Sequence, residues 1–551
     1  MTSVSTDPPF ALALALDGLK FDNRFTRVLP CDAAPGNGIR QVHRAAFSRV
    51  APTPVPRPVT LATSRDVAAL LGIDEATCQS EDFAQVFSGN RLPAGADPFA
   101  ACYGGHQFGS WAGQLGDGRA IALGEVLDQT GQHQTLQLKG AGLTPYSRHA
   151  DGRAVLRSSV REFLCSEAMH HLGIPTTRAL SLVATGDAVV RDMLYDGNAR
   201  AEPGAVVCRV APSFTRFGTF ELPAARADHA LLRRLVDFTI RNDYPALVPA
   251  AELGDGPLSN ETLGRFFDEV CLRTARLLID WMRVGFVHGV LNTDNMSILG
   301  LPIDYGPYGW LESFDAGWTP NTTDAGTRRY RYGAQPEVAG WNLMRLAQAL
   351  LPLTEDPAPF QAGLDRYGET YFQGFHAAMV RRLGWGTPRD DDDERLVGEL
   401  FRLLGRAETD QVLFFRELAR VPLDPQGQLP DDDLLAPLAG AWYQPDEVTG
   451  DVRAAYLGWL RAWARRTVDG GLSDGERRRQ MDALNPRFVL RNYLAQEAID
   501  AAAQGDPSLI GELLEVLRHP YDEQPAHARF AARRPEWARH RVGCSMLSCS
   551  S

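Results

Sequence analysis

The sequence predicts an α+β fold with two lobes, a β-rich small lobe followed by a helical large lobe, with extensions at both ends. Strand-like segments gather in the first half of the chain, at 120–126, 135–140, 179–184 and 205–211. A long amphipathic helix is expected at 262–285, and helical patterns dominate from about residue 337 onward. A chain of 551 residues is too long for one compact unit, so several cooperating domains are expected.

We divide the chain into four segments. Residues 1–95 are expected to form an N-terminal extension that packs on the small lobe, and 96–225 the small lobe itself. Residues 226–360 would form the large lobe and 361–551 a helical C-terminal region. The apolar stretch 10–16, FALALAL, follows Asp7 rather than a basic segment, so we interpret it as an early strand or helix and not as a signal peptide.

The small lobe has one clear hairpin and one clear helix. The strand-like segments 120–126 and 135–140 are separated by the turn-like DQTGQH. Residues 155–173 carry apolar positions at helical spacing, with Ser158 or Ser159 as candidate caps, and Gly173 followed by proline would end the helix. The acidic runs 390–394 and 431–433 are interpreted as helix starts, where negative charge suits the helix dipole.

Charge and cysteine usage exclude several functions. A net charge of −12 argues against nucleic acid or an anionic membrane as partner, since both require a positive field. No apolar run reaches the roughly 18 residues needed to cross a bilayer. The eight cysteines are scattered without a CxxC pair, which indicates neither a zinc site nor a disulfide framework and favours the cytoplasm. Cys544 and Cys549 lie in the tail, where accessible, redox-capable thiols are expected.

Two residues of the small lobe form a candidate phosphate-binding pair. Lys139 closes the strand TLQLK, and Glu162 lies 23 residues later on the predicted helix. In kinases a lysine at the end of a strand contacts nucleotide phosphates, and a glutamate on a helix orients it through an ion pair. Lys139 and Glu162 are therefore expected to pair.

Glycines and arginines supply further candidate phosphate contacts. Gly116 and Gly118, followed by Arg119, would let backbone amides and a guanidinium approach an anion, although a purely structural turn is an alternative. A second glycine turn follows at Asp151–Gly152. Arg209 and Arg216 are seven residues apart and could converge on a phosphate, or could simply lie on the surface.

The loop 288–307, HGVLNTDNMSILGLPIDYGP, carries the sharpest signal. Asn295 and Asp304 offer hard oxygen ligands of the kind that Mg²⁺ takes beside nucleotide phosphates, and 296–303 between them is predicted to be a hairpin. Val290 stands where kinases keep their catalytic aspartate. Asp294 is then the carboxylate in this loop that is free to accept a proton from a hydroxyl, and His288 is interpreted as a structural brace.

The order of glycine loop, hairpin, helix, strands, long helix and polar loop fits a bilobal protein-kinase-like architecture with a nucleotide between the lobes. The blocks YGGHQFGSWAGQLGDGRAIALGE, LQLKGAG, HGVLNTDNMSILGLPIDYGP and the terminal SCSS closely resemble the selenoprotein O family. The resemblance covers most of the chain. It implies a kinase-like fold, long labelled a pseudokinase, that transfers AMP from ATP to Ser, Thr or Tyr hydroxyls of proteins, with the nucleotide bound in reverse.

The resemblance also implies residue roles. Asp294 matches the family's proton acceptor, and Asn295 and Asp304 match its metal ligands, for Mg²⁺ or Mn²⁺. Cys549 takes the place of selenocysteine in animal members, and a pairing with Cys544 is possible but not implied. The family's nucleotide-binding positions fall on Gly116, Gly118, Arg119, Lys139, Asp151, Gly152, Glu162, Arg209, Arg216 and Asp304.

Three alternatives to AMP transfer stay open. The first is a phosphotransferase that moves the γ-phosphate, as the aminoglycoside kinases do. The second is a catalytically silent protein that binds a nucleotide and signals through its C-terminal thiols. The third is UMP transfer from UTP with Mn²⁺, since the residues that face the base cannot be identified from the sequence.

Overall fold

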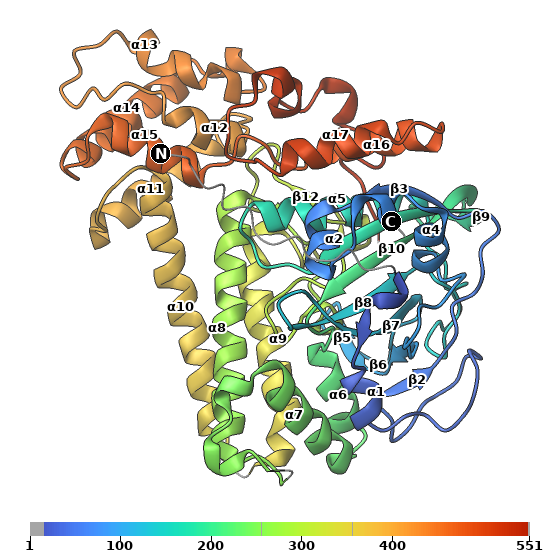
Figure 1. The fold of residues 1–551 in the computed structure, drawn as a ribbon. Helices are drawn as coiled ribbons and strands as arrows, with labels where there is room; N and C mark the ends of the chain where they lie inside the picture. Colours follow the sequence, from blue (N-terminus) through green and yellow to red (C-terminus); the bar gives the residue numbers. More distant parts are fainter. Residues whose placement is uncertain (1–15, 255, 355, 549–551) are drawn as a thin grey trace, which may run out of the picture.

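The computed structural model describes residues 16–254, 256–354 and 356–548. It contains an eight-stranded antiparallel sheet, which lies on the right in Figure 1. The strand order is β2-β4-β7-β8-β10-β9-β3, with β1 paired to β7. Two short pairs lie outside it, β5 with β6 and β11 with β12. The strand bounds are β1 Lys20–Phe21, β2 Phe47–Arg49, β3 Val59–Thr63, β4 Phe99–Ala101, β5 Gly104–Gln107, β6 Ser110–Gln114, β7 Ala120–Leu127, β8 His133–Lys139, β9 Arg178–Arg191, β10 Arg200–Ala211, β11 Phe286–Val287 and β12 Gly309–Trp310.

Helices cover the sheet and then continue to the C-terminal region. Figure 1 shows the long helices α8, α9 and α10 beside the sheet, and the orange and red C-terminal helices across one end of both. The helix bounds are α1 Arg24–Val28, α2 Arg65–Leu71, α3 Glu75–Cys78, α4 Glu81–Phe87, α5 Leu156–His171, α6 Phe217–Ala225, α7 His229–Asp243, α8 Asn260–Val284, α9 Gln335–Leu350, α10 Ala358–Arg382, α11 Asp390–Leu404, α12 Gln411–Leu418, α13 Asp431–Leu435, α14 Gly450–Val468, α15 Asp474–Leu484, α16 Asn492–Ala503 and α17 Ser508–Leu517.

The sheet is buried on both faces. Successive side chains of a strand point to opposite sides, so neighbouring residues enter different cores. On β10, Val207 joins the core that contains α5, whereas Val206 and Cys208 join the core on the other face with Leu138 of β8. Helix α5 packs on β9 and β10 and also contacts α16 and α17. Helices α16 and α17 therefore share one core with the sheet.

Helix α8 delivers the chain to the loop at 288. Ser259 caps its first turn by accepting a hydrogen bond from the Thr262 amide, and Gly285 ends it in the left-handed region at φ +75°. Phe286 and Val287 then form β11 against β12. The sequence predicted this helix, and the structure confirms it.

Most predicted elements of the small lobe are present. The hairpin of β7 and β8 is confirmed, with Ala120 opposite Lys139. Strands β9 and β10 are longer than predicted, and the acidic runs do begin α11 and α13. Between Met296 and Pro302 there is one antiparallel bridge, so the predicted hairpin is a tight turn. The antiparallel sheet and many helices agree with the α+β class, while the bilobal arrangement and the four boundaries stay predictions.

Two expectations need correction. Neither Ser158 nor Ser159 caps α5, because Val155 is the N-cap residue and the Ser158 hydroxyl donates back to the Val155 carbonyl at 3.0 Å. Cys544 is not accessible: it is 1% exposed, and burial raises the pKa of its thiol to about 12. Cys549 and the apolar stretch before Leu16 lie outside the described residues. None of the described helices combines the length and the apolar composition needed to cross a membrane.

Candidate active site

The structure brings Lys139 and Glu162 together. Lys139 is the last residue of β8 and faces Glu162 on α5, with 2.6 Å between Lys139 Nζ and Glu162 Oε2. Both side chains are almost fully buried. A second carboxylate oxygen, Asp304 Oδ1, lies 2.8 Å from the same Nζ, so the lysine is held between two carboxylates.

Three cations converge on Asp304. Arg209 Nη1 lies 2.6 Å from Asp304 Oδ1, and Arg216 Nη1 lies 3.0 Å from Oδ2. Burial alone would raise the pKa of this carboxyl, but Lys139, Arg209 and Arg216 hold it well below its usual range. The two arginines therefore do converge, and in this structure the group on which they converge is a carboxylate.

Asp294 lies in a short 3₁₀ turn, Thr293–Asn295, and its carboxylate is buried. Gln107 Nε2 donates to Asp294 Oδ2 at 3.1 Å, whereas Oδ1 has no hydrogen-bond partner among the described residues. Arg216 Nη1 donates to the Asp294 backbone carbonyl at 2.6 Å and fixes the turn. Burial raises the pKa of the Asp294 carboxyl to about 6. This value suits a base that works near neutral pH.

Asn295 and Asp304 have the donor atoms for a divalent cation. Asn295 Nδ2 donates to the Val290 carbonyl at 2.8 Å, so the amide is fixed by its nitrogen and its carbonyl oxygen stays available. Asp304 supplies carboxylate oxygens, and both residues line the same cavity. Within the described residues no cluster of three or more His, Cys, Asp or Glu could hold a metal. Two protein oxygens fit Mg²⁺ or Mn²⁺ that takes its other ligands from phosphates and water.

His288 behaves as a brace. Its ring stacks on Trp281 with 5.4 Å between ring centroids, and its Nδ1 accepts a hydrogen bond from the Val290 amide. Burial lowers the pKa of His288 to about 4, so the imidazole is neutral at physiological pH.

Lys139, Asp294 and Asp304 line a cavity of about 670 Å³. Its lining carries seven basic side chains (Arg119, Lys139, Arg148, Arg153, Arg191, Arg209 and Arg216) and four acidic ones (Asp117, Asp192, Asp294 and Asp304). This local excess of positive charge lies in a chain whose net charge is −12. It favours a polyphosphate anion as the ligand.

The glycine-dense block lines the cavity, and two of its glycines are required by a neighbouring side chain. A Cβ on Gly116, whose φ is +79°, would lie 2.3 Å from Cγ of Tyr146. A Cβ on Gly118 would lie 2.8 Å from the Tyr146 carbonyl oxygen. The alternative of a structural turn therefore applies in part, because these glycines allow Tyr146 to pack against the block.

Three of the predicted residues do not line this cavity. Asp151 is paired with Arg191 at 2.7 Å, and Gly152 packs against the backbone of Gly142. Glu162 lies behind Lys139. Asp151 is linked to the cavity through Arg191, which lines it.

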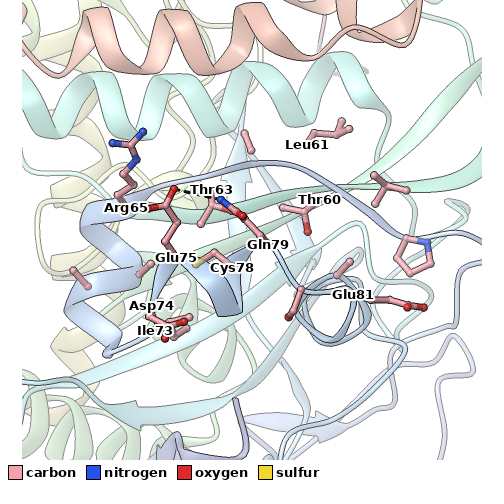
Figure 2. Close-up of a pocket in the computed structure, with 17 residues that line it drawn as sticks. Thr60, Leu61, Thr63, Arg65, Ile73, Asp74, Glu75, Cys78, Gln79 and Glu81 are labelled. Carbon is pink, nitrogen blue, oxygen red and sulfur yellow. Dashed lines mark hydrogen bonds between the residues drawn. The ribbon is translucent and has the colours of Figure 1, made fainter. Parts of the chain in front are cut away.

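A second cavity, of about 880 Å³, lies away from this site between β3 and α2–α4 (Figure 2). Figure 2 shows Thr60 and Leu61 on the strand opposite Cys78 and Gln79. None of the candidate site residues lines it.

Sequence reasoning missed three polar residues of the site. Asp117 accepts hydrogen bonds from the Ala101 amide and from Gln137, and lies 3.5 Å from Arg216. Gln107 Nε2 donates to Asp294 Oδ2, and Asn292 Oδ1 accepts a hydrogen bond from the Phe108 amide. Gln107 and Asp117 both belong to the glycine-dense block, in which the sequence predicted contacts only for Gly116, Gly118 and Arg119. Asn292 precedes Asp294 by two residues.

The site combines a buried lysine–glutamate pair with a buried carboxylate, one oxygen of which lacks a hydrogen-bond partner among the described residues, and an arginine-rich cavity. This combination is typical of enzymes that act on a nucleoside polyphosphate. A sequence model of the family described as "Protein adenylyltransferase SelO" matches residues 37–518. The chain is 57% identical to "Protein nucleotidyltransferase YdiU" of Rhodopirellula baltica, covering 97% of this chain and 99% of that protein. It is 58% and 59% identical to the proteins of the same name in Aromatoleum aromaticum and Azoarcus sp., which cover 97% of this chain each and are themselves covered to 100% and 99%.

The chain belongs to the SelO family and is a nucleotidyltransferase. The family resemblance drawn from the sequence motifs is thereby confirmed.

Proposed function

We propose that this enzyme transfers AMP from ATP to Ser, Thr or Tyr hydroxyls of proteins, with Asp294 as the general base. The observation that carries the proposal is the Asp294 carboxylate, which lines the basic cavity with one oxygen held by Gln107 and the other without a partner. The family description and the names of the relatives support nucleotidyl transfer to protein.

The reaction is an in-line displacement at the α-phosphorus. The acceptor hydroxyl loses its proton to Asp294, and its oxygen forms a bond to that phosphorus. The bond from the α-phosphorus to the oxygen shared with the β-phosphate breaks, and pyrophosphate leaves with the electron pair. Lys139, Arg209 and Arg216 stabilise the charge that builds on the departing pyrophosphate.

Asn295 and Asp304 would hold the divalent cation, Mg²⁺ or Mn²⁺. When bound, the cation supplies positive charge beside the phosphate oxygens. Since Asp304 contacts Lys139, Arg209 and Arg216 at once, it also keeps those three side chains at the same end of the cavity.

Labelled nucleotides test the proposal directly. Protein incubated with ATP labelled at the α-phosphate should become radioactive, and protein incubated with ATP labelled at the γ-phosphate should not. Mass spectrometry of the acceptor should find an AMP adduct on a hydroxyl side chain. Label from the γ position would instead identify a kinase, and a UMP adduct formed in preference with UTP and Mn²⁺ would change the donor.

A further inference from the structure

The hairpin of β5 and β6 has an unusual turn. Gln107 pairs with Ser110, and the two residues between them, Phe108 and Gly109, both have positive φ, +50° and +84°. Two-residue turns of this kind favour Asn-Gly. A bulky residue in the left-handed region costs roughly 1–2 kcal/mol, so other contacts must hold Phe108 in place.

Those contacts come from the loop that carries Asp294. The Phe108 amide donates to Asn292 Oδ1 at 3.2 Å and to the Tyr330 hydroxyl at 2.9 Å. The Phe108 ring lies 5.2 Å from the Tyr330 ring, centroid to centroid. The Tyr330 hydroxyl in turn donates to Asn292 Oδ1. The strained turn is therefore held by the loop beside the candidate base.

The residues before Phe108 contact the same loop. The His106 amide donates to Thr293 Oγ1 at 2.7 Å, and Gln107 Nε2 donates to Asp294 Oδ2 at 3.1 Å. Three consecutive hairpin residues thus bind the three consecutive loop residues 292–294. This pattern fixes the loop in three places.

Gly105 adds a steric limit. A Cβ at position 105 would lie 3.0 Å from both Cβ and Oδ1 of Asp294, closer than side chains normally approach. The backbone of β5 therefore lies directly against the carboxylate, which leaves it little room to rotate away from Gln107.

The hairpin is itself anchored to the helices. His106 Nδ1 lies 2.6 Å from Glu221 Oε1 on α6. The His106 ring also contacts Trp111 of β6 and Trp341 of α9, with 5.1 and 5.5 Å between ring centroids. The hairpin that contacts the loop is therefore itself held by α6 and α9.

We propose that the β5–β6 hairpin sets the orientation of the Asp294 carboxylate, with Gln107 as the positioning residue. The Gln107 amide holds Oδ2, and the backbone at Gly105 lies against the Oδ1 side, so the carboxylate is kept in one orientation. This inference rests on the proposed function, in which Asp294 is the base.

Gln107→Ala tests the positioning role. Its kcat should fall about 10- to 100-fold, as a misplaced catalytic group does, while the Kd for ATP stays at the wild-type value. The amide donates to the ionised carboxylate, so its loss should also move the acid limb of the kcat–pH profile to higher pH. Ser110→Ala on the exposed part of the same hairpin is the matched control and should behave as wild type. Thermal melts establish that each variant is folded.

Gly105→Ala is the second variant, and it should lower kcat with ATP binding retained because the new methyl group displaces Asp294. Gln107→Ala combined with Asp294→Asn completes a double-mutant cycle. The expected result is no further loss in the Asp294→Asn background. An equal loss in both backgrounds, or a Gln107→Ala variant with wild-type kcat and pH profile, would overturn the positioning role.

The two proposals fail in different ways. A fully active Asp294→Asn variant refutes Asp294 as the base, and the positioning role falls with it. A fully active Gln107→Ala variant beside an inactive Asp294→Asn variant refutes the positioning role alone.

Discussion

Replacing Asp304 with asparagine tests whether one carboxylate balances the buried cations of the site. Its oxygens lie 2.8 Å from Lys139 Nζ, 2.6 Å from Arg209 and 3.0 Å from Arg216. Asparagine has nearly the same side-chain shape as aspartate but lacks its negative charge. Removing one partner of a buried ion pair costs about 3–5 kcal/mol. The Asp304 side chain is 27% exposed and Glu162 remains beside Lys139 and Arg209, so we expect about 3 kcal/mol.

The contribution of Asp304 to the free energy of unfolding depends on pH, and it is fully present at neutral pH. The pKa of Asp304 is lowered in the folded state, so its stabilisation is present above the pKa of the unfolded chain. That stabilisation is lost only as the pH falls through the lower, folded value. Denaturant unfolding at neutral pH therefore measures the whole contribution.

The assay is the unfolding midpoint with and without inorganic pyrophosphate in a metal-free buffer. The Asp304→Asn variant should unfold earlier than wild type, and pyrophosphate should stabilise the variant more, because the anion replaces the missing negative charge. Asp432→Asn is the control. Asp432 pairs with Arg453 at 2.8 Å with a side chain that is 90% exposed, and such surface pairs contribute little.

An unchanged midpoint would refute the idea that Asp304 stabilises this cluster. An equal shift with pyrophosphate in both proteins would refute the idea that the anion takes the place of the Asp304 charge.

Four further outcomes are expected. Asp294→Ala should lower kcat about 10²- to 10⁴-fold with ATP binding by calorimetry unchanged, and near-normal turnover would contradict its role as base. Because burial raises the Asp294 pKa to about 6 and the base must be ionised, kcat should fall as the pH drops below about 6; a limb near 4 would argue against it. Gly116→Ala should destabilise more than Gly131→Ala in chemical denaturation, since both have φ near +80° but only Gly116 faces Tyr146; equal losses would exclude the clash. Iodoacetamide should leave Cys544 unlabelled in the folded protein and label it after unfolding, as mass spectrometry would show.

The sequence was informative where local rules dominate. Lys139 at a strand end and Glu162 on a helix were predicted to pair by analogy with the lysine–glutamate pair of kinases, and their charged atoms lie 2.6 Å apart. Helix α8 and the β7–β8 hairpin were predicted because their hydrophobic periods are regular and their ends carry glycine or turn residues.

The sequence was uninformative where contacts join distant segments. Gln107 and Asp294 are 187 residues apart, and no local pattern pairs an amide in a glycine-rich block with a carboxylate in a later loop. Cys544 was predicted to be accessible from its place near the chain end, but it is buried in the same core as α5 and α16. Burial of that kind depends on tertiary packing, which position in the chain does not specify.

The burial of α5 has a consequence for biosynthesis. This helix, which carries Glu162, contacts α16 and α17, and α16 begins about 320 residues after α5 ends. At roughly 5–20 residues per second, the ribosome needs tens of seconds to make that length. During that time part of the apolar surface of α5 lacks its final covering, so we expect the nascent chain to depend on chaperones until the C-terminal helices emerge.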